Sequence, residues 1–354
     1  GLVWSIAPTS MSFVARKKYS CWWITLSQRN GIALVLCVLC WLNGCSAPQF
    51  HPVSDQKVAP SIVGNAFVMS DGYLLPFNTY VPETPKAVVV ALHGFNDYRK
   101  AFDDFCSAMK AREIACFAFD QRGFGETAYH GYWSQPGQLQ SDFLTVVGLL
   151  AKRFPELPVF AAGESMGGAV ILTALRGKAN SDAISLKGAI LMAPAVWARH
   201  TQPWYQRLAL WLTVHTFPGW RPTGEGLEIQ ATDNIEALRE MGRDPLVIKG
   251  TRIDAIYGLT NLMDQALASV EEQHFPLLVL YGERDEVIPQ KPTCEMLRRM
   301  VTAEVSFDFA LYENGYHMLT RDLQAQHMFA DVVDWIRGQR VGDHAAEKVK
   351  DYCE

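Results

Sequence analysis

The sequence has no large excess of charge of either sign. Charged residues make up 19% of its 354 positions, and the formal net charge is -5. A nucleic-acid-binding protein usually presents a concentrated positive surface, so we expect no nucleic-acid partner. Hydrophobic residues account for 49% of the chain, which is typical of a globular protein and excludes a largely disordered one.

The short motifs of nucleotide and metal chemistry are also missing. The sequence contains no Walker-type phosphate loop, no H-E-x-x-H pair and no internal repeat. We therefore expect neither a bound metal nor another cofactor. The length suits one large α/β domain with an insertion, or two domains.

The eight cysteines do not suggest a disulfide framework. Four of them lie in the first 45 residues, and the others are scattered at Cys106, Cys116, Cys294 and Cys353. Cys116 lies in an apolar run, where a free cysteine behaves as a small core residue. We therefore expect no disulfide framework in the folded part of the chain.

A long membrane-spanning run is absent, and the N-terminal segment instead has the pattern of an export signal. Arg16, Lys17 and Lys18 precede the apolar residues 31–42, which are too few to span a bilayer comfortably. The run ends in Leu-Asn-Gly-Cys45, which resembles the lipobox of bacterial lipoproteins. A plain membrane anchor, or a cleaved signal with an incidental cysteine, is the alternative.

In the lipoprotein interpretation, the signal is cut before Cys45, whose thiol then carries diacylglycerol. We expect residues 1–45 to be the signal segment and residues 46–60 a short tether. Met11 is a plausible start, so residues 1–10 need not be native. Acyl chains on Cys45 would hold the protein at a membrane of the bacterial cell envelope.

The rest of the chain is arranged around residues 157–170. An apolar run of strand type leads into G-E-S-M-G at residues 163–167, and a helical pattern follows. A serine on a tight strand-to-helix turn needs neighbours without side chains, and the new helix directs free N–H groups toward an oxyanion. The pattern predicts that Ser165 is the nucleophile of a nucleophile elbow; a functionless turn of small residues is the alternative.

Strand and helix patterns alternate on both sides of this turn. Apolar runs at 87–92, 114–119 and 188–194 predict strands buried on both faces, and residues 138–154 predict an amphipathic helix. An earlier D-G turn predicts a hairpin, in which Pro76 would mark an edge strand. The alternation predicts a parallel sheet.

Three motifs carry a resemblance to a known family: H-G-F at residues 93–95, F-D-x-R-G-F-G at 119–125 and G-E-S-M-G-G at 163–168. They resemble the α/β-hydrolase superfamily, and within it the monoacylglycerol lipase and lysophospholipase branch, also described as serine aminopeptidase S33. The resemblance implies a mostly parallel eight-stranded sheet flanked by helices, with a helical cap inserted.

The loop after the strand at 87–92 is expected to supply part of an oxyanion hole. We assign the two donors to the backbone amides of Phe95 and Met166. His93 is expected to brace this loop without taking a proton. Asp120 and Arg122 are expected to fix the neighbouring turn by pairing with each other and with the backbone.

The acid and the base are predicted in the second half of the chain. Asp285 follows an apolar strand in G-x-x-D-x-x-x-P, where the family has its triad acid. Its neighbours Glu283 and Glu286 are interpreted as solvated loop charges. His317 follows the last predicted strand on a glycine-containing loop, and the order Ser, Asp, His agrees with α/β-hydrolases.

The insertion is rich in aromatic residues. The resemblance implies that residues 196–272 form a cap over the active site, and Trp197, Trp204 and Trp211 are the candidate substrate-binding residues. The alternative is that these aromatics form the cap's own small core. Exposed aromatics would also suit a membrane interface.

We therefore divide the core into residues 61–195 and 273–340, followed by a loose charged tail at 341–354. The predicted function is a serine hydrolase that cleaves lipid-like carboxylic esters, such as monoacylglycerol or lysophospholipid, through an acyl-enzyme on Ser165. A peptidase or small-ester hydrolase of the same fold is the first alternative. A non-catalytic lipid-binding surface lipoprotein is the second.

Overall fold

The computed structural model describes residues 46–354, apart from 179–183, 225, 227 and 343–344. The predicted export signal, including Cys45, lies outside the described residues. Within the described part of the chain, none of the helices combines the length and the apolar character that a membrane span needs.

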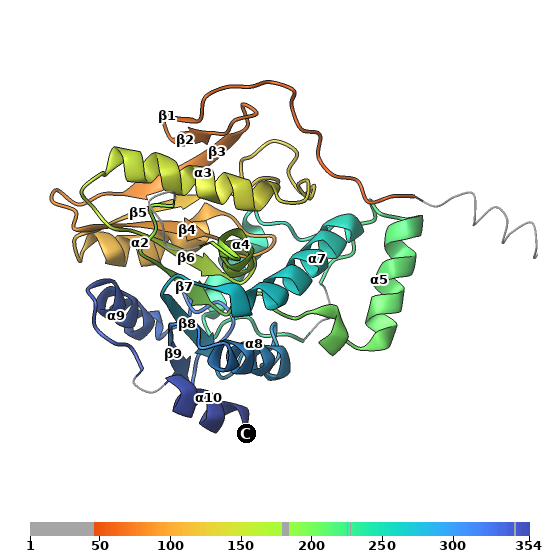
Figure 1. The fold of residues 1–354 in the computed structure, drawn as a ribbon. Coiled ribbons are helices and arrows are strands. Elements are labelled where there is room, and N and C mark those ends of the chain that lie inside the picture. The colour runs from red at the N-terminus through yellow and green to blue at the C-terminus, as the bar shows by residue number, and fades with distance from the viewer. Residues whose placement is uncertain (1–45, 179–183, 225, 227, 343–344) are drawn as a thin grey trace, which may run out of the picture. The chain divides into compact units, whose positions relative to one another are not determined.

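A mostly parallel sheet of nine strands forms the centre of the described residues (Figure 1). Its strand order is β1-β2-β3-β5-β4-β6-β7-β8-β9. The pairs β1–β2, β2–β3 and β3–β5 are antiparallel, and all pairs from β5 to β9 are parallel. In chain order the strands are β1 (Ser61–Val63), β2 (Ala66–Val68), β3 (Leu74–Tyr80), β4 (Ala87–Leu92), β5 (Ile114–Phe119), β6 (Val159–Glu164), β7 (Gly188–Met192), β8 (Leu277–Gly282) and β9 (Phe307–Tyr312).

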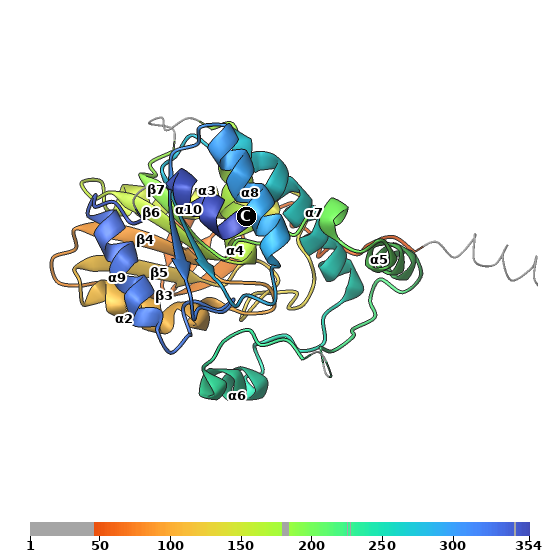
Figure 2. The same ribbon diagram turned by 90° about the horizontal axis from the view of Figure 1, so that it is seen from below.

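Helices cover both faces of this sheet (Figures 1 and 2). Helices α3, α4, α7 and α8 bury their apolar sides against one face, and α2 and α9 against the other. The helical elements are η1 (Arg99–Phe102), α2 (Asp103–Lys110), α3 (Gln138–Arg153), α4 (Met166–Leu175), η2 (Arg199–Thr201), α5 (Trp204–Thr216), α6 (Ile235–Arg243), α7 (Ile253–Ser269), η3 (Val270–Glu272), α8 (Gln290–Thr302), α9 (Ala325–Ile336) and α10 (Ala345–Cys353).

Strand β4 shows why its continuous apolar run is needed. Side chains alternate across a strand, so Val88, Val90 and Leu92 enter the core on one face while Val89 and Ala91 enter the core on the other. Full burial of a valine or leucine side chain contributes about 2 kcal/mol. A polar residue anywhere in this strand would therefore enter one of the two cores.

The sheet corrects two expectations. It has nine strands and not eight, because the three-residue strands β1 and β2 extend it beyond β3. Pro76 does not mark an edge, because β3 pairs with β2 along its first half and with β5 along its second. Pro76 lies at the change of partner, and its carbonyl accepts a hydrogen bond from Asp120 N at 2.8 Å.

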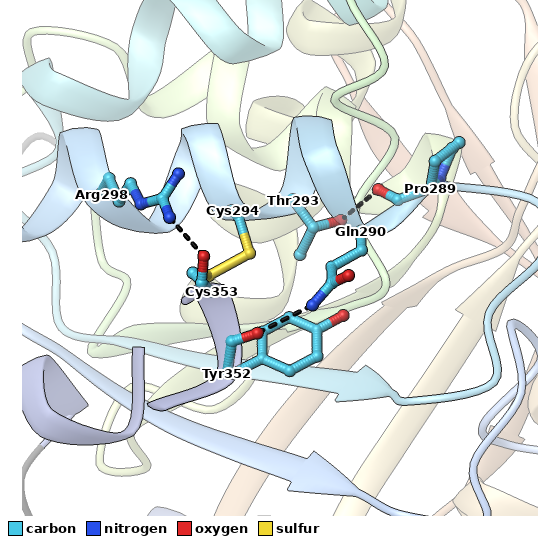
Figure 3. Close-up of a disulfide and its surroundings, with 7 residues drawn as sticks. All are labelled: Pro289, Gln290, Thr293, Cys294, Arg298, Tyr352 and Cys353. Atoms are coloured by element: carbon cyan, nitrogen blue, oxygen red, sulfur yellow. Dashed lines mark hydrogen bonds between the residues drawn. A yellow bond between two sulfur atoms is a disulfide. The ribbon is translucent and has the colours of Figure 1, made fainter. Parts of the chain in front are cut away.

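The scattered cysteines form disulfides, contrary to expectation. One disulfide, Cys106–Cys116, joins α2 to β5, and a second, Cys294–Cys353, joins α8 to α10 (Figure 3). The partners of the second bond are 59 residues apart in sequence, so only the folded chain brings them together. The buried position predicted for Cys116 is confirmed.

The C-terminal tail is not loose. Residues 345–353 form helix α10. It buries Val349 in the core between the sheet and helices α3, α4, α7 and α8, which is called the main core below. Figure 3 shows how its end is held: Gln290 Nε2 donates to Tyr352 O at 2.8 Å, and Arg298 donates to Cys353 O. The charges of this segment lie on the outer side of an amphipathic helix. Because the sequence shows mainly these charges, it suggested a loose tail.

The predicted cap residues 196–272 contain helices that are held in different ways. Helix α7 packs against the face of the sheet that α3, α4 and α8 also cover, with Leu262, Met263 and Ala266 in the main core. Helix α5 buries only Val214 among its described residues, and α6 buries none. Figures 1 and 2 show α5 at the outside of the sheet and its helices, and Figure 2 shows α6 there as well.

Candidate active site

Ser165 lies on the turn between β6 and α4. Its φ of 52° is in the left-handed region, which residues with a side chain rarely adopt. Gly163 and Gly167 permit this turn: a Cβ on Gly167 would lie 2.1 Å from Leu92 O, and a Cβ on Gly163 would lie 2.5 Å from the Gly167 carbonyl carbon. The strained backbone and the two close approaches are the features of a nucleophile elbow.

Phe95 and Met166 border this serine. Met166 is the first residue of α4, where backbone N–H groups have no partner within the helix. The loop after β4 comes close to the serine from the other side, since a Cβ on Gly94 would lie 3.5 Å from the Ser165 Cβ. The two predicted donors therefore belong to the two segments that meet at Ser165.

The loop after β4 is fixed by its own polar groups. His93 Nε2 accepts a hydrogen bond from Gln121 N at 2.9 Å, so its Nδ1 carries the proton and donates to Gly94 O at 2.8 Å. Burial lowers the pKa of His93, which keeps the ring neutral. Asn96 Nδ2 also donates to Thr251 Oγ1 at 2.7 Å. His93 therefore braces the loop, in line with its interpretation from the sequence.

Asp120 and Arg122 fix the neighbouring turn, but they do not pair with each other as expected. Asp120 pairs with Arg99. The guanidinium of Arg122 is fully buried and contacts two carboxylates, Asp71 Oδ2 at 2.6 Å and Asp142 Oδ2 at 2.8 Å. A buried guanidinium needs several acceptors, and these come from positions distant in the sequence.

Asp285 and His317 meet through a direct hydrogen bond. His317 Nδ1 lies 2.8 Å from Asp285 Oδ2, and both side chains are buried. The other carboxylate oxygen of Asp285 accepts from Val287 N at 2.8 Å and Ile288 N at 2.9 Å, which fixes the carboxylate plane. The neighbouring acids, Glu283 and Glu286, are exposed.

The environment of His317 favours its charged form. Burial alone would lower the pKa of the imidazole, but the Asp285 carboxylate, with smaller contributions from Glu164 and Asp322, raises the pKa above its ordinary value. Asp285 accepts from Nδ1, so Nε2 is the nitrogen left to exchange a proton. Such a pair can remove a proton from a hydroxyl and stabilise the resulting imidazolium.

A residue that the sequence reasoning missed links this pair to the serine. Thr320 Oγ1, three residues after His317, donates to Glu164 Oε2 at 2.8 Å. Glu164 directly precedes Ser165, so this bond brings the turn of His317 to the elbow. The available signal was the charged residue inside the apolar strand β6, which needs a partner if it is buried.

The three candidate tryptophans occupy different environments. Trp197 is half-buried and packs against the main core. Trp204 and Trp211 lie on α5 and expose 71% and 54% of their surface. The structure therefore does not gather the three side chains in one pocket. Cys45, the predicted lipidation residue, lies outside the described residues.

The sheet order, the elbow after β6 and the acid–base pair after β8 and β9 define an α/β-hydrolase. Solved structures agree with this fold. The chain aligns with a soluble variant of monoglyceride lipase from Saccharomyces cerevisiae at a TM-score of 0.64 and 18% identity, over 83% of this chain and 100% of that one. It aligns with a carboxyl esterase from Bacillus coagulans at a TM-score of 0.62 and 19% identity, over 78% and 98%.

The family model described as "Serine aminopeptidase, S33" matches residues 83–324, and the chain belongs to this family. It is similar to the monoacylglycerol lipase of Mycolicibacterium smegmatis, with 26% identity over 77% of this chain and 96% of that protein. It is also similar to the monoglyceride lipase of Rattus norvegicus, with 25% identity over 72% and 84%. The expected α/β-hydrolase fold is thus confirmed, and the chain is a hydrolase of this family.

Proposed function

We propose that the protein hydrolyses lipid-like carboxylic esters, of the monoacylglycerol or lysophospholipid class, through an acyl-enzyme on Ser165. The observation that carries this proposal is the buried 2.8 Å hydrogen bond between His317 and Asp285, on a turn that is tied to the elbow. The monoacylglycerol lipases among its relatives support the choice of substrate class.

In the proposed cycle, His317 Nε2 takes the proton of Ser165 Oγ as the oxygen attacks the ester carbonyl. Asp285 holds the imidazole in the correct tautomer and stabilises its charged form. The amides of Phe95 and Met166 bind the oxyanion, and His317 returns the proton to the leaving alcohol. Water then repeats the sequence on the acyl-enzyme, which releases the fatty acid and restores Ser165.

A panel of substrates tests the proposal. Purified protein should hydrolyse long-chain monoacylglycerols and lysophospholipids with a kcat/KM at least tenfold higher than that for aminoacyl amides of equal size. The reason is that a site for acyl chains favours these lipids. The reverse order would support the peptidase alternative. Binding of these lipids without turnover would support the non-catalytic alternative.

We also propose that the protein is a lipid-anchored envelope protein that works at a membrane surface. Three observations support this proposal. The lipobox pattern ends at Cys45, and the next residue, Ser46, donates its N–H to His215 O in the last turn of α5 at 2.8 Å. Helix α5 exposes large apolar side chains. Disulfides such as Cys294–Cys353 are typical of oxidising compartments.

Replacing the predicted lipidation residue tests the anchor. The Cys45→Ala variant should leave the membrane fraction and take up no labelled fatty acid, while its hydrolysis of a soluble ester stays unchanged. A variant that still fractionates with membranes and incorporates the label elsewhere would contradict the lipoprotein proposal.

A further inference from the structure

Glu164 is a buried carboxyl group that the proposed cycle does not use. It directly precedes Ser165, and only 2% of its surface is exposed. Its Oε2 accepts a hydrogen bond from the Thr320 hydroxyl at 2.8 Å. Burial of a carboxyl group is costly, so its presence in an otherwise apolar strand needs an explanation.

The groups around Glu164 come from three separate elements. Arg321, on the same turn as Thr320, binds Asp97 Oδ2 at 2.6 Å. Asp97 belongs to the loop that carries Phe95, and Arg321 and His317 are the positive groups near Glu164. Glu164 therefore lies where the elbow, the oxyanion loop and the turn of the base come together.

Three carboxyl groups favour the charged form of His317. Asp285 binds its Nδ1 directly. Asp322 is held by Tyr316 N at 2.7 Å and by the Thr232 hydroxyl at 2.7 Å. Glu164 is the third, and it comes from the strand that ends at the nucleophile.

We propose that Glu164 is a positioning residue for His317, which ties the turn of the base to the elbow through Thr320 and adds a further negative charge to the surroundings of the imidazole. The inference deepens the proposed function and rests on it. The hydrogen bond between Thr320 and Glu164, called the tie below, keeps the base aligned with Ser165. The charge stabilises the imidazolium that forms when the serine proton is transferred.

The protonation state of Glu164 is the central variable. Burial raises the pKa of Glu164, and the neighbouring Asp97 adds to this rise, whereas Arg321, His317 and the Thr320 hydroxyl act in the opposite direction. The hydroxyl of Thr320 donates to the carboxyl, and Arg321 and a protonated His317 are nearby positive charges. The net direction of the pKa is upward, so Glu164 loses its proton less readily than an ordinary carboxyl group. We take the ionised form, which the Thr320 hydroxyl and Arg321 favour, and the pH profile of Glu164→Gln tests it.

The Glu164→Gln variant separates charge from shape. Glutamine keeps the size of the side chain and an oxygen that accepts from Thr320, but it removes the negative charge. Loss of that charge lowers the pKa of His317, so the base stays neutral to lower pH. The acid limb of kcat/KM for a soluble ester should move down by about half a unit to one unit, with kcat reduced about tenfold.

The Thr320→Val variant separates the tie from the charge. Valine keeps the shape of threonine and removes the hydroxyl that supports the carboxylate. We expect kcat to fall about tenfold with KM unchanged, and the acid limb to move in the same direction by a smaller amount. A purely structural role of Glu164 would lower kcat in both variants without moving either acid limb.

The decisive experiment is the pH profile of kcat/KM for the wild type, Glu164→Gln and Thr320→Val, with Ser165→Ala as a blank. An acid limb of Glu164→Gln that coincides with that of the wild type overturns the inference. If Glu164→Gln does not fold, wild-type kcat and an unmoved limb in Thr320→Val overturn it. Activity that persists in Ser165→Ala would instead refute the proposed function itself.

Discussion

The turn around His317 and helix α5 are held in opposite ways. His317, Asp285 and Glu164 are buried, and each makes a hydrogen bond of 2.8 Å to another side chain of the site. Helix α5 buries only Val214 of its described residues and exposes a set of large apolar side chains: Trp204, Tyr205, Leu208, Trp211 and Leu212. The core fixes the geometry of a reaction, whereas α5 leaves apolar surface available.

The difference indicates a division of labour. Reacting groups must be held within fractions of an ångström, which the buried hydrogen bonds provide. Removing apolar surface from water contributes about 25 cal/mol of free energy for each Å² buried. Lipid that covers the exposed side chains of α5 therefore stabilises the contact. In this account the core performs the chemistry and α5 brings the enzyme to its substrate.

The largest effect should come from the core. The Ser165→Ala variant should lose about a million-fold in turnover on every ester, because the nucleophile itself is missing. The fold should be unchanged, since Ser165 contributes to it through backbone bonds to Met192 and Ala195. Steady-state kinetics and a thermal melt check both statements. An esterase rate near that of the wild type would assign the reaction to another group.

A smaller and selective effect should come from α5. Replacing Trp204 and Trp211 with Ala should reduce hydrolysis of long-chain esters in vesicles by about ten- to a hundredfold, because apolar contact with the lipid is lost. Hydrolysis of a soluble acetate ester should change less than about twofold.

The matched control for this pair is Leu74→Ala, an exposed apolar truncation on β3, outside the insertion. It should leave both substrates unaffected. Equal losses on vesicles and on acetate in the tryptophan variant would show that α5 supports the core and does not select the substrate.

The smallest effect on turnover should come from the disulfide Cys294–Cys353, which fastens α10 to α8 and is called the C-terminal clasp below. A Cys294→Ser/Cys353→Ser variant should keep its kcat within about twofold, because the hydrogen bonds from Gln290 and Arg298 still hold the end of α10. Its free energy of unfolding should fall by about 2–4 kcal/mol, since the bond closes a long loop. Urea unfolding measures this loss. An unchanged midpoint, or a midpoint of the wild type that does not respond to reductant, would contradict the clasp.

The elbow and the acid–base pair could be predicted because each candidate residue directly follows an apolar strand. Ser165, Asp285 and His317 occupy the positions that α/β-hydrolases use, and the glycines around Ser165 carry a steric requirement that is visible in the sequence. The strands β4, β5, β7 and β8 were equally readable, since their continuous apolar runs match burial on both faces.

The features that could not be predicted depend on contacts between distant segments. The partners of Arg122 come from residues 71 and 142, and the partner of Cys294 is Cys353. Helix α10 was missed because its burial depends on a few side chains such as Val349 among charged neighbours. The role of Glu164 was invisible until Thr320 lay beside it.

The most direct test of the central claim is labelling with a fluorophosphonate, followed by peptide mapping. The account predicts one adduct per chain, on Ser165, which forms at the rate set by a neutral His317 and is absent in Ser165→Ala. No adduct on the folded protein, or an adduct on a different serine, would contradict the assignment of Ser165 as the nucleophile.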